Sequence, residues 1–154
     1  LVFVPAQLAK RPVDYYREKI EAKTIIGKLS KKPIELAPPI IIGAMSFGAL
    51  NRETKTILAL ASALAGTAEN TGEGGMLEEE RKYSKYLIGQ YSTGRFGIND
   101  EYFQKADAIE IKIGQGAKPG AGGFLPGFKV TEEIARVRNK PIGQDIHSQP
   151  AIRI

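Results

Sequence analysis

Short apolar runs alternate with amphipathic segments through most of the chain. Four runs are predicted to be strands: 40–43, 67–70, 86–91 and 108–113. The first is short, β-branched and flanked by Pro and Gly, and in the last Ile109, Ile111 and Ile113 alternate with charged residues. Helices are predicted between and after them, from Asn51 to about Gly66, over 100–106 and after Thr131. Asn51 and Thr131 are good N-cap residues, which supports these helix starts.

Other segments give weaker predictions. The apolar face of the first long helix is predicted from its spacing: Ile57, Leu58, Leu60, Ala61 and Leu64. The charged stretch 78–85 is expected to be an exposed helix or loop, and 114–127 a long Gly/Pro loop. Residues 1–38 are expected to be an irregular lead-in, because prolines interrupt them, with one short helix around 13–22.

The order of the elements predicts an α/β fold. Strands that alternate with helices form parallel sheets, and successive strands tend to be neighbours, so the four strands are expected side by side in chain order. In each unit a polar, Gly-rich loop follows the strand. Such loops fit both a (βα)8 TIM barrel and an open doubly wound sheet. A TIM barrel has eight units in about 250 residues, whereas four units are predicted here.

Composition excludes several classes of protein. The net charge of +5 arises from dispersed Lys and Arg residues without a recognition motif, so no nucleic-acid partner is expected. No apolar run approaches the roughly 18 residues of a membrane span, and no signal peptide is recognised, so we expect a cytoplasmic protein without a membrane partner. The chain has no Cys, and its single His147 lacks partners for a metal site or a catalytic triad.

Polar residues follow all four predicted strands. They are Ser46 after the first, Asn70 and Glu73 after the second, Arg95 after the third, and Lys112 with Gln115 at the end of the fourth. Singly, each is explained as a surface or structural residue, and Lys112 could pair with Glu110 or Glu69. Together they favour a site, because the carboxyl ends of barrel strands meet at one mouth. The Gly114 loop matches neither a Rossmann nor a Walker motif.

Four segments resemble the FMN-binding synthase domain of glutamate synthase: 43–50, 70–75, 92–97 and 110–120. Residues 2–8 resemble the segment that precedes this domain in the short archaeal-type enzymes. The resemblance implies a TIM barrel, of which this chain covers about the first four βα units. The domains implied are a lead-in over 1–38 and the amino-terminal half of the FMN-binding barrel, truncated, over 39–154.

The resemblance also implies a function. Such an enzyme uses FMN to reduce 2-iminoglutarate, formed from 2-oxoglutarate and ammonia, to glutamate. A glutaminase partner supplies the ammonia, and an electron-donor subunit or domain supplies electrons through iron–sulfur centres ligated outside this chain. The roles implied are catalytic for Lys112, Glu73 and Arg95, cofactor-binding for Ala44, Met45, Ser46, Asn70, Arg95, Lys112 and Gln115, and substrate-binding for Glu73, Gln115 and Lys118.

Two departures from the family pattern leave alternatives open. Ala121 stands where the family typically has an acidic residue, and residues 149–154 differ from the expected continuation, which suggests a frameshift. The family's cluster cysteines and phosphate-binding loops lie further downstream, so we expect the 154-residue chain alone not to make glutamate. The alternatives are a truncated non-catalytic fragment or assembly partner, another FMN-dependent TIM-barrel oxidoreductase, and a methylamine-using glutamate synthase.

Overall fold

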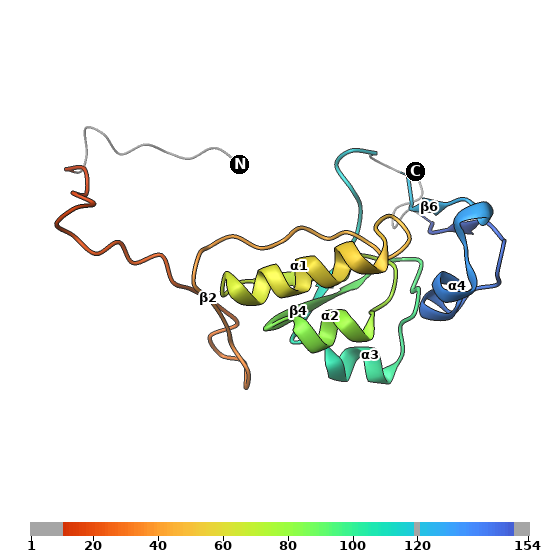
Figure 1. Ribbon diagram of the computed structural model, residues 1–154, viewed down its shortest axis with the longest axis horizontal. Coiled ribbons are helices and arrows are strands. Elements are labelled where there is room, and N and C mark those ends of the chain that lie inside the picture. Colours follow the sequence, from red (N-terminus) through yellow and green to blue (C-terminus); the bar gives the residue numbers. More distant parts are fainter. Residues whose placement is uncertain (1–10, 119–120, 150–154) are drawn as a thin grey trace.

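A three-stranded parallel sheet lies at the centre of the molecule (Figure 1). The computed structural model describes residues 11–118 and 121–149. Strands β3 (Ala68–Asn70), β4 (Tyr86–Tyr91) and β5 (Ala108–Ile111) are hydrogen-bonded in that order. The second, third and fourth predicted strands are therefore confirmed as parallel neighbours in chain order, although β5 ends two residues before its predicted end.

The first predicted strand, 40–43, is wrong. These residues run beside β3, where Ile42 N–H donates to the Ala68 carbonyl at 3.0 Å and the Thr67 hydroxyl donates to the Ile40 carbonyl, but they have no strand assignment. Nor is the run buried, because Ile40 is 68% exposed. The two prolines before Ile40 lack the N–H groups that would extend a ladder, so the apolar run does not become a strand.

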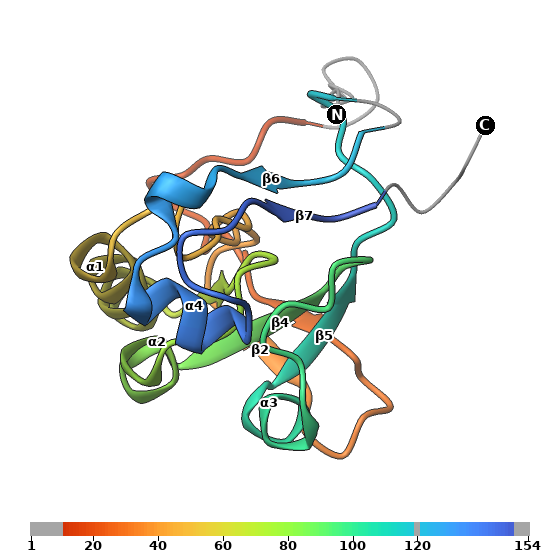
Figure 2. The same cartoon turned by 90° about the vertical axis from the view of Figure 1, so that its right-hand side faces the viewer.

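Three helices cover one face of the sheet (Figure 2). They are α1 (Arg52–Leu64), α2 (Glu78–Tyr83) and α3 (Asp100–Lys105). The start of α1 is confirmed, since the Asn51 side chain accepts a hydrogen bond from Thr54 N–H at 2.9 Å, as an N-cap does. Asn99 caps α3 in the same way. The predicted bounds of α1 and α3 therefore agree with the structure within a residue or two, and the Asn99 cap is a feature that the sequence analysis did not predict.

The predicted inner face of α1 is wrong. Ile57, Leu60 and Leu64 are exposed, Leu64 at 89%, whereas Lys55, Ala59 and Ser62 are fully buried. Small side chains allow a helix to approach its neighbours closely, and a Lys is buried when its charge is paired. The stretch 78–85 was predicted to be an exposed helix or loop. It does contain helix α2, but Glu80 of this helix is fully buried as the partner of Lys55. Charge pairing thus overrides hydrophobic spacing here.

The lead-in contains a hairpin that the sequence did not predict. Strands β1 (Thr24–Ile26) and β2 (Ile34–Leu36) pair antiparallel, and β2 packs Ile34 and Leu36 against Ala68 and Ile88 of the sheet. The helix predicted over 13–22 is wrong: only a single turn forms at Asp14, and these residues extend away from the body. Short helices depend on packing for stability, and nearly all side chains of 11–23 are exposed within the described residues.

A second group of elements lies beyond the carboxyl ends of the strands (Figure 2). Strands β6 (Phe124–Leu125) and β7 (Ile146–His147) pair antiparallel, so the long loop predicted to end at Gly127 contains a short strand. A 3-10 turn, η1 (Gly127–Lys129), and helix α4 (Glu132–Arg138) connect them. The helix after Thr131 is thus confirmed. These elements share a core: Phe47, Leu77, Phe96, Leu125, Val130, Ile134, Ala135 and Ile146.

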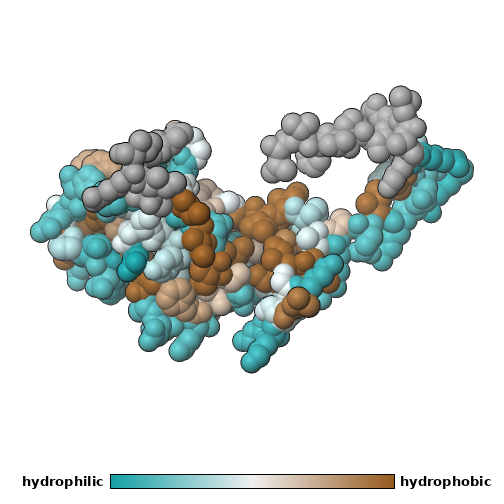
Figure 3. All heavy atoms as spheres, turned by 180° about the vertical axis from the view of Figure 1, so that it is seen from behind, coloured by the Kyte–Doolittle hydropathy of each residue, from teal (hydrophilic) through white to brown (hydrophobic). Residues whose placement is uncertain are grey.

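The surface combines polar and apolar areas. Apolar side chains gather on part of the face opposite to that of Figure 1 (Figure 3). The exposed apolar residues include Ile109 and Ile111 of β5, which lies at one edge of the sheet, and Ile113 directly after it. Within 11–118 and 121–149, no helix is both long enough and apolar enough to cross a membrane.

Candidate functional site

A cavity of about 260 Å³ lies where the loops that follow the strands meet strands β6 and β7. Because strands of a parallel sheet end at the same edge, loops far apart in sequence contribute to one wall. The residues predicted for the site that line the cavity are Ala44, Met45, Ser46, Glu73, Lys112, Gln115 and Lys118. The structure therefore brings most of the predicted site together.

Two glycines allow the loops of this wall to lie against each other. Gly72 has a φ of +67°, and a Cβ built on it would lie 2.5 Å from Ser46 N. A Cβ on Gly74 would lie 2.9 Å from the Phe47 carbonyl oxygen. Only glycine permits both the left-handed backbone and this close approach. The result is a close-packed wall whose cavity side is formed by 44–46 and 72–73.

Lys112 and Glu73 form an ion pair at the cavity. Lys112 Nζ lies 3.2 Å from Glu73 Oε1 and donates to Gln115 Oε1 at 3.5 Å. The partner of Lys112 is thus neither Glu110 nor Glu69, the two carboxylates that the sequence suggested. The two side chains are 20% and 14% exposed. An ammonium has three donors, so Lys112 can still bind a ligand while Glu73 holds it in place.

A polar network lies beneath the pair on the same face of the sheet. Glu110 accepts hydrogen bonds from Asn70 Nδ2 at 3.0 Å and from Gln90 Nε2 at 2.5 Å. Asn70 Oδ1 also accepts from Gly72 N–H at 2.9 Å. Asn70 does not line the cavity; its side chain is occupied in fixing the loop that carries Gly72.

Arg138 is a cavity residue that sequence reasoning missed. It lies at the end of α4, is 96% buried, and donates to the Phe47 carbonyl at 2.7 Å and to Ser46 Oγ at 3.3 Å. Burial lowers the pKa of its guanidinium, while the nearby Glu73 charge opposes this shift. An Arg guanidinium nevertheless stays charged in proteins. Sequence gave no signal for it, because an Arg in the last turn of a helix is common.

Arg95 is not brought to the cavity. Its side chain is exposed and lies over the ring of Tyr91, 5.9 Å from the ring centroid. Its backbone has a φ of +49°, which is uncommon for a residue other than glycine. The residue follows β4 as predicted, but it does not line the cavity. Its predicted cofactor-binding and catalytic roles therefore gain no support from position.

A second charged cluster lies behind the cavity wall. Lys55 Nζ is 2.7 Å from Glu80 Oε1 and 3.5 Å from Glu69 Oε1, and all three side chains are buried. Burial raises the pKa of Glu80 to about 7 and also raises the pKa of Glu69, although Lys55 opposes both shifts. Sequence reasoning missed the cluster, since its members are dispersed among α1, β3 and α2.

The fold is α/β, and a cavity that is a candidate small-molecule site lies at the carboxyl ends of its parallel strands. The site carries the positive charges of Lys112, Lys118 and Arg138, which suit an anionic ligand. Residues 4–153 match the family model described as the conserved region in glutamate synthase. The chain belongs to the glutamate synthase family.

Individual relatives agree with this assignment. The chain is 44% identical over 149 residues to a glutamate synthase large subunit-like protein of Rhizobium meliloti (strain 1021), covering 96% of this chain and 34% of the relative. It is 46% identical to the archaeal glutamate synthase [NADPH] of Methanocaldococcus jannaschii, covering 94% and 34%. It is 38% identical to the chloroplastic ferredoxin-dependent glutamate synthase of Spinacia oleracea, covering 93% and 10%. The chain thus spans about a third of the first two relatives.

Proposed function

We propose that this chain forms one wall of the active site of an FMN-dependent glutamate synthase. The whole enzyme would convert 2-oxoglutarate and ammonia to glutamate through 2-iminoglutarate, on a (βα)8 barrel of which β3, β4 and β5 are consecutive strands. Family membership and the relatives named glutamate synthase support this proposal. The observation that carries it is the cavity in which Lys112, Glu73 and Arg138 meet.

The residues of the wall fit a flavin. The backbone at Ala44, Met45 and Ser46 lines the cavity, and two glycines keep neighbouring side chains out of this surface. Lys112 places a cation beside it, which would stabilise negative charge at the edge of a reduced flavin without rearranging. When bound, FMN supplies hydride transfer. Glu73 would orient the Lys112 ammonium, and Gln115 would provide a polar contact on the same side.

The second ligand of this site is proposed to be the dicarboxylate 2-oxoglutarate. In 11–118 and 121–149, no carboxylate forms an ion pair with Arg138, so its guanidinium can bind an incoming carboxylate. Lys118 offers a second cation on the same cavity. Two separated cations suit a molecule with two carboxylates. Within the described residues, Nη1 of Arg138 donates no hydrogen bond, so it can donate to one of them. Arg138 thus joins Lys118, Gln115 and Glu73 as a substrate-binding candidate.

The proposed reaction needs partners. A glutaminase subunit or domain would supply ammonia, and an electron donor would reduce the flavin through iron–sulfur centres ligated outside this chain. The relatives' names include both NADPH and ferredoxin. Reduction of the flavin in the full-length protein by NADPH and by reduced ferredoxin, measured side by side, would identify its electron donor.

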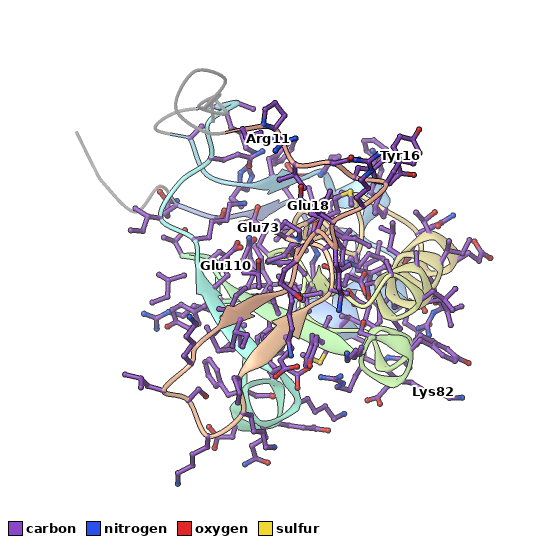
Figure 4. The ribbon with its side chains drawn as sticks, turned by 90° about the vertical axis from the view of Figure 1, so that its left-hand side faces the viewer. Arg11, Tyr16, Glu18, Glu73, Lys82 and Glu110 are labelled. Carbon is purple, nitrogen blue, oxygen red and sulfur yellow. The ribbon has the colours of Figure 1, made fainter. Side chains whose placement is uncertain are left out.

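The test is a binding and turnover assay on the full-length protein. We expect saturable quenching of FMN fluorescence, and oxidation of a reductant that requires both 2-oxoglutarate and ammonia. Arg138→Lys should raise the KM for 2-oxoglutarate about tenfold, because the guanidinium donor to its carboxylate is lost, with a smaller rise in the Kd for FMN, since Arg138 also contacts Ser46. Lys82→Ala on α2 is the control, since Lys82 lies far from the cavity in Figure 4. A folded protein that binds no FMN would contradict the proposal.

A further inference from the structure

Lys55 reaches the backbone of the cavity wall from behind. In addition to its two Glu partners, its Nζ donates to the carbonyl oxygens of Met45 at 2.7 Å, Asn70 at 3.2 Å and Thr71 at 3.4 Å. Met45 belongs to the loop that lines the cavity, and Asn70 and Thr71 precede the loop with Gly72 and Glu73. One buried ammonium therefore connects helix α1 to both loops of this wall.

The contact to Met45 fixes the direction of a peptide group. In a trans peptide the C=O and the following N–H point in opposite directions. With the Met45 carbonyl held toward Lys55, the Ser46 N–H points away from the buried cluster. Within the described part of the chain, this N–H donates no hydrogen bond. A backbone donor without a protein partner, on a cavity-lining residue, is available to an acceptor atom of a ligand.

We propose that Lys55 is a positioning residue that holds the Met45–Ser46 peptide in the orientation in which Ser46 N–H can donate to the bound cofactor. This inference rests on the proposed function, because it assigns the cofactor as the acceptor. It goes beyond a stabilising role, since the same lysine also fixes Asn70 and Thr71, and thereby the distance between the two loops of the wall.

Arg81 shows what a purely structural cation does in the same fold. It pairs with Asp107 at 2.6 Å and donates to the carbonyls of Lys105 at 2.8 Å and Ser84 at 3.1 Å. These residues lie at the ends of α2 and α3, and none of them lines the ligand cavity. Arg81 and Lys55 therefore make the same kinds of contact, but only those of Lys55 reach the ligand cavity.

The experiment separates positioning from stability in the full-length protein. Lys55→Met alone leaves two buried carboxylates without a cation and is expected to unfold easily. The triple variant Lys55→Met, Glu69→Gln, Glu80→Gln removes all three charges, so its unfolding midpoint is expected to return near that of the wild type. Its Kd for FMN is still expected to be about tenfold weaker, the loss of roughly one hydrogen bond. Arg81→Met is expected to lower stability while the Kd for FMN stays unchanged.

A triple variant with wild-type stability, wild-type affinity for FMN and an unaltered absorption band of the bound flavin would overturn the proposal. Amide hydrogen exchange in the ligand-free protein gives a readout that does not depend on the cofactor. Exchange is expected to be at least about tenfold faster over 44–50 and 70–75 in the triple variant than in the wild type, and equal elsewhere. Unchanged exchange in these two segments would also overturn it. If the wild type binds no FMN, the proposed function fails while the exchange result still tests the role of Lys55.

Discussion

Two lysines, Lys55 and Lys112, each pair with glutamate on opposite faces of the same sheet, and their surroundings differ. Lys55 lies on the face covered by helices, where it and both of its partners are excluded from water. Lys112 lies at the cavity, where it and Glu73 keep some exposure. A fully buried charge must be satisfied by fixed protein groups, whereas a charge at a cavity remains free to bind a ligand. The comparison predicts that substitution of Lys55 changes stability and the structure of the cavity wall, whereas substitution of Lys112 changes the reaction rate.

The largest expected effect is on stability at Lys55. Lys55→Met should lower the free energy of unfolding by about 3–5 kcal/mol, because it leaves Glu69 and Glu80 as buried charges without a cation. Lys112→Met should change it by no more than about 1 kcal/mol, as expected for a partly exposed pair. Urea unfolding of both variants measures the difference. Equal losses in the two variants would show that burial does not distinguish the lysines.

The pH dependence of stability should come from the buried cluster. Burial raises the pKa of Glu80 from 4.5 to about 7. Between these values the folded protein binds more protons than the unfolded chain, so its stability falls as the pH rises from about 4.5 to about 7, by about 3 kcal/mol for this group. Glu69, whose pKa is also raised, acts in the same direction, and Lys55 opposes both shifts.

Unfolding curves at pH 5 and pH 7 check this expectation. Glu80→Gln should reduce the difference between the two pH values. Glu78→Gln on the same helix is the matched control, because its side chain is 84% exposed and it should leave the difference unchanged. A wild-type protein that is more stable at pH 7 than at pH 5, with Glu80→Gln showing the same difference, would refute the assignment to Glu80.

At the cavity, the expected effect is on rate. In the full-length enzyme, Lys112→Ala should slow flavin reduction or imine reduction by about a hundredfold, the size seen when a preorganised charge-stabilising donor is removed. Its unfolding free energy should stay close to that of the wild type. Stopped-flow measurement of the flavin absorbance gives the rate. A near-wild-type rate would remove Lys112 from the catalytic group.

The smallest effect is expected at Arg95. Its exposed side chain rests on the Tyr91 ring and not in the cavity. Arg95→Ala should therefore change stability by less than about 0.5 kcal/mol, as surface substitutions usually do, and leave the Kd for FMN and the KM for 2-oxoglutarate unchanged. A large rise in either constant would show that this residue reaches the ligands after all.

The sequence by itself determined the parallel strands, the helix starts and most of the site. Alternation of Ile with charged residues identified β5, and a cap identified the start of α1. Polar residues after the predicted strands identified Ser46, Glu73, Lys112 and Gln115 as candidates. These features are local, or follow from the rule that parallel strands end at one edge. The similarity of four loops to one family identified the family to which the family model then assigned the chain.

Only the tertiary structure decided which charges are buried and which are free. Nothing near Lys55 in the sequence indicates that α1 turns it inward while Ile57 and Leu64 face outward, because Glu69 and Glu80 come from other elements. Arg138 likewise joins the cavity through the packing of α4 on the Phe47 loop. Arg95, in contrast, lies outside the cavity, in a turn where its φ is positive. The pairing of charged side chains and the orientation of a helix depend on contacts between segments that are distant in sequence. The hydrophobic spacing within one segment therefore cannot predict them.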